Sequence, residues 1–188
     1  NDLKKSILVF EINSKKKIIL ISLKKNLEAF EIENLGADFY NFIKTNNISK
    51  LSINSHTIKN EFQDDPTGRF LHGLKLKAYE FNFYKYKKNK NLILIDVFTK
   101  KNNNTIKNEI RFKALEEGTN FARDLVSEPP NVLNPKEYVK RLLKLRKLGI
   151  KVTVYNEKQL FKLGMHSLLG VGRGSINESF LVTLEWNG

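Results

Sequence analysis

The side chains that could do chemistry are few in this sequence and widely separated. The three histidines have neither the His-Glu-x-x-His spacing of a zinc site nor a nearby acidic cluster: His56, His72 and His166. Adjacent carboxylates occur at 64–65 and 116–117, but sequence neighbours point in different directions, so neither pair is an obvious acid–base dyad. The pair at 64–65 is better explained as residues that cap the start of a helix.

A glycine-rich segment at 170–175, Gly-Val-Gly-Arg-Gly-Ser, has the composition of a phosphate cradle. A dinucleotide-binding fingerprint needs a strand before it, a helix after it and a third glycine where Ser175 stands here. The surrounding periodicity predicts the reverse order, a helix before the segment and a strand after it. We therefore expect a tight loop whose glycines permit positive φ, with a phosphate site as the less favoured alternative.

The complete absence of cysteine removes thiol nucleophiles, cysteine zinc sites and disulfide scaffolds from consideration. Hydrophobic residues make up 40% of the 188 residues, which predicts a folded protein of one ordinary domain or two small ones. No apolar run approaches the ~20 residues of a membrane helix. The apolar run at 7–10 is also too short for a signal peptide, so we expect a cytoplasmic protein.

The elements that must position any site alternate between strands and helices in the first half of the chain. In order they are strands at 6–12 and 17–23, a helix at 36–45, a strand at 51–55, a helix at about 66–79 and a strand at 92–98. The pair Asp64-Asp65 supplies the cap of the second helix, and the apolar run at 92–98 is typical of a strand buried on both faces. This alternation predicts an α/β layer domain over residues 1–103.

The longest predicted element is a helix at about 105–127. Its apolar residues keep a helical period: Ile106, Ile110, Ala114, Phe121, Leu125 and Val126. The helix must end at Glu128, because Pro129 and Pro130 follow and the residue before a proline avoids the helical region. We interpret residues 104–128 as a linker helix between two domains.

A second unit begins after the prolines. Asn134 caps a helix that has Pro135 at its first position and Glu137 as a variant of the capping box. Its expected buried stripe is Tyr138, Val139, Leu142, Leu143, Leu145 and Leu148. Gly149 ends the helix, and a strand at 150–154, a short helix near 157–163 and a strand at 180–186 follow. These elements are too few for a complete sheet domain, so we expect residues 129–188 to begin a larger, truncated domain.

The charge is unevenly distributed. Lys and Arg number 33 against 20 Asp and Glu, a net charge of +13, and residues 75–113 alone carry eleven basic and three acidic groups. Aromatic residues between positions 79 and 86 are interleaved with this lysine-rich region, so weak nucleic-acid binding is one interpretation. Lysines outnumber arginines 27 to 6, however, whereas phosphate and base recognition favours arginine. A solvated lysine-rich surface is the preferred interpretation.

One long segment resembles a known family. Residues 117–135, Glu-Gly-Thr-Asn-Phe-Ala-Arg-Asp-Leu-Val-Ser-Glu-Pro-Pro-Asn-Val-Leu-Asn-Pro, resemble the linker-helix and proline segment of leucyl (cytosol) aminopeptidases. Residues 163–175 are similar to the next stretch of that family, and 72–85 to its N-domain helix and following strand. Six positions that match the family are interpreted as structural: Asn120, Arg123, Pro129, Pro130, Asn131 and Pro135. Asn134 replaces the commoner Thr.

The resemblance implies a macro-domain-like N-terminal α/β domain at 1–103, a linker helix at 104–128 and the beginning of a C-terminal peptidase domain at 129–188. Family members are cytoplasmic, hexameric metalloexopeptidases of peptide catabolism. They use two divalent metal ions, Mn or Zn, to activate the water that releases N-terminal Leu and other residues from peptides.

The family's metal ligands and catalytic Lys and Arg lie in motifs that do not occur in residues 1–188. No catalytic, metal-binding or substrate-binding residue is therefore expected here, and the chain alone is expected to be inactive. Its role would be in assembly and in access to the active site. A nucleic-acid-binding module that uses region 75–113 is the alternative function.

Overall fold

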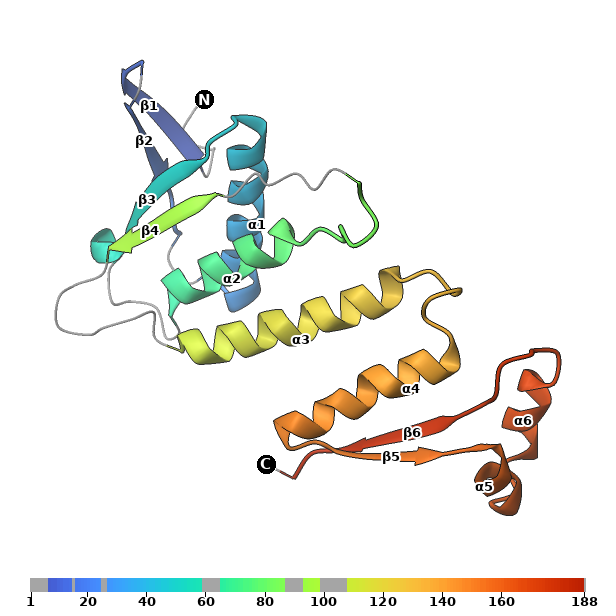
Figure 1. The fold of residues 1–188 in the computed structure, drawn as a ribbon. Helices are drawn as coiled ribbons and strands as arrows, with labels where there is room; N and C mark the ends of the chain where they lie inside the picture. The colour runs from blue at the N-terminus through green and yellow to red at the C-terminus, as the bar shows by residue number, and fades with distance from the viewer. Residues whose placement is uncertain are drawn as a thin grey trace. The chain divides into compact units, whose positions relative to one another are not determined.

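The computed structural model describes residues 7–14, 16–24, 27–58, 65–86, 93–98 and 108–187 (Figure 1). The chain divides into two compact units, Asn1–Ala122 (unit 1) and Arg123–Gly188 (unit 2), and the division falls inside helix α3 (Glu109–Ser127). Each unit combines helices with small sheets, so the mixed α/β class expected from the sequence is confirmed. Within the described residues, no helix is both long enough and apolar enough to cross a membrane.

Unit 1 begins with the predicted hairpin of β1 (Ile7–Asn13) and β2 (Lys16–Ile21), which pair antiparallel. The backbone N–H of Lys16 donates to Asn13 Oδ1 at 2.9 Å and closes the turn. The side chains of Ile7, Ile19 and Ile21 lie on the face that packs against the core of unit 1. Register in such a hairpin follows from which face is buried.

Helix α1 (Ala29–Thr45) starts well before the predicted position 36. Glu28 and Glu31 form a reciprocal capping box, in which the N–H of Glu28 donates to Glu31 Oε2 at 2.8 Å. The sequence prediction missed this start because Ser, Thr, Asp and Asn, rather than Glu, are the residues that usually signal a helix cap.

The remaining elements of unit 1 form a parallel crossover. Strand β3 (Lys50–Asn54) leads through the short 3-10 turn η2 (Ser55–Thr57) and helix α2 (Pro66–Ala78) to β4 (Leu94–Phe98), which pairs parallel to β3. A parallel pair needs such a connection across the sheet. Asp65 caps α2 as predicted, since its Oδ1 accepts from the N–H of Gly68 at 3.0 Å; Asp64 lies outside the described residues.

The core of unit 1 lies between α1, α2 and the inner faces of the strands. Its buried side chains come from the two helices: Ile32, Phe39, Ile43, Phe70, Leu71 and Leu74. The prediction that the last strand is buried on both faces is wrong for its described part, because Leu94 and Phe98 are each 58% exposed. Ile93, Ile95 and Val97 pack against the core, since among the described elements α1 and α2 cover one face of the strand.

Helices α1 and α2 approach so closely that each contributes a glycine to the crossing. A Cβ added to Gly36 would lie 2.9 Å from the carbonyl carbon of Phe70, and one added to Gly73 would lie 2.7 Å from Glu33 Cα. Both positions are closest of all to a carbonyl oxygen of the facing helix. Only glycine fits this crossing without a shift of backbone.

Among the described residues, none of the apolar side chains that keep the helical period of the long helix is buried. Phe112 is the single buried side chain of α3, whereas Ile110 and Val126 are each 87% exposed. The helical period itself is present over the described span Glu109–Ser127, and the predicted residues 105–107 lie outside the described range. A periodic pattern identifies a helix, but the neighbouring elements decide which face is covered.

Unit 2 packs helix α4 (Pro135–Leu143) on the antiparallel strands β5 (Lys151–Tyr155) and β6 (Leu181–Glu185) (Figure 1). In chain order α5 (Glu157–Lys162) and α6 (His166–Gly172) come between the two strands, and they lie at one end of the strand pair. The predicted single helix is two, since the 3-10 helix η3 (Lys144–Leu148) follows α4. Gly149 ends η3 with φ of 85°, as predicted. The predicted stripe is only partly buried, because Leu142 is 7% exposed but Leu148 is 66% exposed.

Candidate functional site

The connection between α3 and α4 contains the segment that carries the family resemblance. After Ser127, Pro129 and Pro130 prevent the helix from continuing. The N–H groups of Val132 and Leu133 both donate to the carbonyl oxygen of Pro129 at 2.9 Å. The double proline therefore begins a hydrogen-bonded turn, and this turn delivers the chain to the cap of α4.

Asn134 caps α4 as predicted: its Oδ1 accepts from the N–H of Glu137 at 3.0 Å. The other half of the predicted capping box does not form, because the carboxylate of Glu137 is engaged elsewhere. Its Oε1 accepts from Arg141 Nε at 3.3 Å, and its Oε2 lies 3.4 Å from Lys140 Nζ. Cations one turn further along the helix compete successfully with the cap N–H for this carboxylate.

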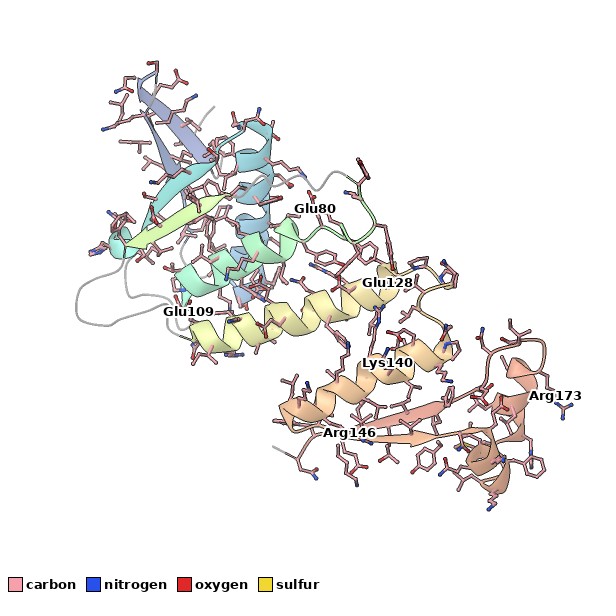
Figure 2. The ribbon with its side chains drawn as sticks, in the orientation of Figure 1. Glu80, Glu109, Glu128, Lys140, Arg146 and Arg173 are labelled. Atoms are coloured by element: carbon pink, nitrogen blue, oxygen red, sulfur yellow. The ribbon has the colours of Figure 1, made fainter. Side chains whose placement is uncertain are left out.

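A nearly buried ion pair joins the end of α3 to α4. Glu128, which follows the end of α3 (Figure 2), lies with its Oε1 3.0 Å from Arg141 Nη1, and the Glu128 side chain is only 6% exposed. Arg141 is 20% exposed and also donates to Glu137, so one guanidinium serves two carboxylates. Such a charge is tolerated in a buried place only because its partner is present.

The electrostatics of this network favour the charged forms. The hydrogen bond to Glu128 raises the pKa of Arg141 above its usual value, against the opposing effect of desolvation. Desolvation by itself would raise the pKa of Glu137, but the hydrogen bond from Arg141 and the charge of Lys140 more than offset it and lower that pKa. Arg141 and Glu137 are therefore held in their charged forms, and the network can fix geometry.

The other family-matching positions lie along the same connection. Asn120 and Arg123 belong to α3, Asn131 to the turn and Pro135 to the first position of α4. Within the described residues the buried Oδ1 of Asn120 has no hydrogen-bond partner, whereas Arg123 does have partners. These residues lie where the chain passes from α3 to α4, which agrees with a structural role. That role stays a prediction.

The histidines are not brought together. His56 lies in η2, where its N–H donates to Asn54 Oδ1; His166 begins α6 and meets the ring of Phe161 edge-on at 4.8 Å; and His72 is buried in α2. Among the residues that the structure describes, no group of three or more His, Cys, Asp or Glu could hold a metal ion. The described residues therefore do not fit the dinuclear metal centre that the resemblance implies.

A buried polar cluster in unit 1 was not anticipated from the sequence. Glu33 of α1 accepts from Arg69 Nη1 at 2.8 Å and lies 3.4 Å from His72 Nδ1. The Arg69 guanidinium and the His72 ring each lie 5.4 Å from the ring of Phe112. The sequence feature that points to this cluster is the i, i+3 spacing of Arg69 and His72 on the helix. A single sequence does not show which carboxylate would face them.

The glycine-rich segment does not form the loop that was expected. Gly170 and Gly172 lie in the last turn of α6, and neither they nor Gly174 has a positive φ. Gly172 instead lies close to the Ser179 side chain, whose Oγ a Cβ at this position would meet. A helix precedes the segment and a strand follows it, as predicted. The segment forms the last turn of that helix, and this end of a helix does not present a cradle of N–H groups.

The lysine-rich region is only partly described, since 87–92 and 99–107 lie outside the described residues. Of its described lysines, Lys75 lies 3.4 Å from Glu116 Oε2 and is already paired.

An apolar groove of about 340 Å³ lies between α4 and β6 in unit 2, and among its lining residues Tyr138 alone has a polar side-chain group. That groove can receive apolar side chains but supplies no catalytic chemistry.

Comparison with known proteins connects these features to a family. Residues 120–188 match the model of the cytosol aminopeptidase family, catalytic domain. A "Probable cytosol aminopeptidase" of Rhizobium leguminosarum bv. trifolii is 32% identical over 181 residues, 93% of this chain and 36% of that protein. Proteins of the same description from Afipia carboxidovorans and Phytoplasma mali are 42% and 38% identical over 62% and 63% of this chain, and 24% and 25% of their own lengths.

Solved structures agree at the level of the fold. A mutant of tomato leucine aminopeptidase has a TM-score of 0.75 at 18% identity, covering 95% of this chain and 37% of that one. The bottromycin maturation enzyme BotP in complex with Mn has a TM-score of 0.71 at 20% identity, covering 96% and 39%.

This chain belongs to the cytosol aminopeptidase family. It spans between about a quarter and just over a third of the length of the curated relatives that it matches. The relatives give no support to the alternative of a nucleic-acid-binding module.

Proposed function

We propose that these residues are the N-terminal part of a metal-dependent aminopeptidase, a hydrolase that releases Leu and other N-terminal residues from peptides. The observation that carries the proposal is the segment 117–135. It has the family's residue pattern, most of it lies within the part matched by the family's catalytic-domain model, and it folds into a connection secured by the Glu128–Arg141 ion pair.

The domain organisation is proposed in the same terms. Residues 1–103 are an N-terminal domain with macro-domain-like layering, 104–128 a linker helix and 129–188 the beginning of the peptidase domain. Support comes from the parallel crossover β3–α2–β4 and from TM-scores of 0.71 to 0.75 with longer solved enzymes. The first part would then serve assembly and access to the active site rather than chemistry.

The cofactors and partners follow from the family. We propose two divalent metal ions, Mn or Zn, held by residues outside these 188, together with peptide substrates, a homo-hexamer and a cytoplasmic location. A solved enzyme of similar fold is described in complex with Mn, which supports the proposal that the whole protein depends on metal ions. The described residues contribute no cluster that could bind such ions.

The test uses the full-length protein encoded by the complete reading frame in which these residues lie. The purified product, supplied with Mn or Zn, should release p-nitroaniline from leucine p-nitroanilide, and a chelator should abolish the activity until metal is restored. The 188-residue chain, assayed alongside, should release none under the same conditions. A well-folded, metal-supplied full product without activity on any N-terminal leucyl substrate would overturn the proposal.

A matched pair of variants connects the assay to the structure. Arg141→Met in the complete product should lower the yield of folded, active enzyme, because it removes the guanidinium that pairs with the nearly buried Glu128 carboxylate. Lys140→Met, one position earlier and 71% exposed, should leave yield and activity unchanged. Equal behaviour of the two variants would mean that the ion pair does not support the enzyme.

A further inference from the structure

A turn directly after α2 exposes an unusual concentration of aromatic side chains. This aromatic turn consists of Phe81, Phe83, Tyr84 and Tyr86. Phe83 is 62% exposed, Tyr84 57% and Tyr86 fully exposed, while Phe81 is half-buried. Single exposed aromatics are ordinary, but three within four residues form a patch of the kind found at the centre of protein interfaces.

The aromatic turn is held in place by polar contacts at its base. Glu80 Oε1 accepts from Lys44 Nζ of α1 at 2.9 Å, and Glu80 Oε2 accepts from Asn82 Nδ2 at 3.1 Å (Figure 2). The backbone N–H of Lys85 donates to the carbonyl oxygen of Asn82 at 3.4 Å. The turn is therefore tied to unit 1 before any partner arrives, which reduces the entropy lost on binding.

The aromatic rings of the turn also pack against one another. The ring of Phe81 lies 5.3 Å from that of Phe83 and 5.8 Å from that of Tyr84, and both pairs are tilted by more than 50°. Tilted contacts of this kind produce a compact knob rather than parallel, separated faces. A knob fits a pocket on a protein partner, whereas successive bases of a nucleic acid stack on open ring faces.

The charge around the aromatic turn identifies the kind of partner. Lys77 occupies the last turn of α2 just before it and Lys85 lies within it, whereas Lys75 is paired with Glu116. In the sequence, region 75–113 has eleven basic against three acidic groups. A second copy of this chain would bring like charges together, which is unfavourable. The preference for lysine over arginine, 27 to 6, also weakens the case for phosphate recognition.

From these observations we infer that the aromatic turn is a docking surface for an acidic protein segment that carries apolar anchor residues. The anchors pack against Phe83 and Tyr86, and the carboxylates lie near the surrounding lysines. The aromatic turn lies outside residues 120–188, which match the family's catalytic-domain model.

The test measures binding to the 188-residue chain by fluorescence anisotropy at physiological salt. The probe is a short fluorescein-labelled peptide in which Asp and Glu alternate with Leu and Phe. Three competitors are the same peptide with Lys in place of the acids, the same peptide with Ser in place of the apolar residues, and an oligothymidylate. Saturable binding of the acidic–apolar peptide, with weak or no binding of the three others, is the expected result.

The structure offers a closely matched control. Phe30, on α1 of the same unit, is exposed to the same 62% as Phe83 but lies outside the aromatic turn. Phe83→Ser should weaken the peptide roughly tenfold or more, as for an interface hot spot, and Phe30→Ser should leave it unchanged. Tyr86→Ser should weaken it as well, and because that ring is fully exposed the substitution removes no internal packing.

Circular dichroism of each variant establishes that it is folded. The proposal is overturned if the acidic–apolar peptide shows no saturable binding, or if it binds Phe83→Ser and Tyr86→Ser as it binds the unaltered chain. It is equally overturned if the lysine peptide binds as tightly, or if the oligothymidylate binds more tightly. Tighter binding of the oligothymidylate would favour nucleic-acid recognition by this region.

Discussion

The crossing of α1 and α2 makes a strong prediction about stability, because it depends on the absence of two Cβ atoms. In Gly73→Ala the new methyl group would lie 2.7 Å from Glu33 Cα and closer still to the carbonyl group of that residue. The obstructing atoms are backbone, so no side-chain rotation relieves the contact. The two helices must separate, and they carry most of the buried core of unit 1.

The expected loss follows from two opposing contributions. Alanine in a helix interior is favoured over glycine by about 1 kcal/mol. Overpacking of a close contact costs typically ~1–3 kcal/mol, and a clash with backbone belongs at the upper end of that range. The net destabilisation of unit 1 is therefore about 2 kcal/mol, and Gly36→Ala should lose a similar amount against Phe70. Gly118→Ala has no neighbouring atom within 4 Å, so it should gain ~0.5–1 kcal/mol.

Urea unfolding followed by far-ultraviolet circular dichroism measures these changes. For a slope of ~2 kcal/mol per molar urea, Gly73→Ala should unfold about 1 M earlier than the unaltered chain. The single tryptophan, Trp186, lies in unit 2, so its fluorescence reports that unit separately. If Gly73→Ala unfolds at the same urea concentration as Gly118→Ala, or later, then the close crossing of α1 and α2 is wrong.

Three further outcomes test the electrostatics and capping. Arg141→Met should destabilise unit 2 by roughly 1.5–3 kcal/mol, seen in Trp186 fluorescence during urea unfolding, because it removes a charge-assisted hydrogen bond to the 6%-exposed Glu128 carboxylate. A loss no larger than that of Lys140→Met would contradict this. Asn134→Ala should cost unit 2 about 1 kcal/mol through loss of its helix cap, and an unchanged midpoint would rule out the capping role. The hydrogen bond from its lysine partner on α1 lowers the pKa of Glu80 below its ordinary value of 4.5, so the stability it contributes is present above that pH and is lost as the pH falls through the lowered value. Thermal unfolding between roughly pH 6 and pH 3 should therefore show a shallower decline for Glu80→Gln than for the unaltered chain, and parallel curves would refute the assignment.

Local signals accounted for much of the secondary structure. Asp65 and Asn134 marked helix starts, Gly149 marked an end, and alternating Ile and Val marked strands, because each of these depends on atoms a few residues apart. The start of α1 was missed because Glu28 and Glu31 cap each other by a less common pairing. The glycines at 170–175 were misread because none of them has a positive φ; of the three, only Gly172 lies close to another residue, Ser179.

The connection that carries the family resemblance was located from sequence alone, but its internal contacts were not. The double proline and Asn134 predicted where α3 ends and α4 begins. The pairing of Glu128 with Arg141 crosses from one helix to another, and it displaced the expected contact between Glu137 and the cap. Which cation a carboxylate chooses depends on distances that a linear pattern does not contain.

The sequence by itself determined the family, the α/β class and the lack of cysteine chemistry, since these depend on composition and on a long contiguous motif. The tertiary structure alone decided which faces are covered. It buried Phe112 while leaving Ile110 exposed, placed Glu33 beside Arg69 and His72, and set two glycines at the closest approach of α1 and α2. It also gathered the aromatic turn into a knob. Burial is a property of what packs against a residue, and those neighbours are distant in the chain.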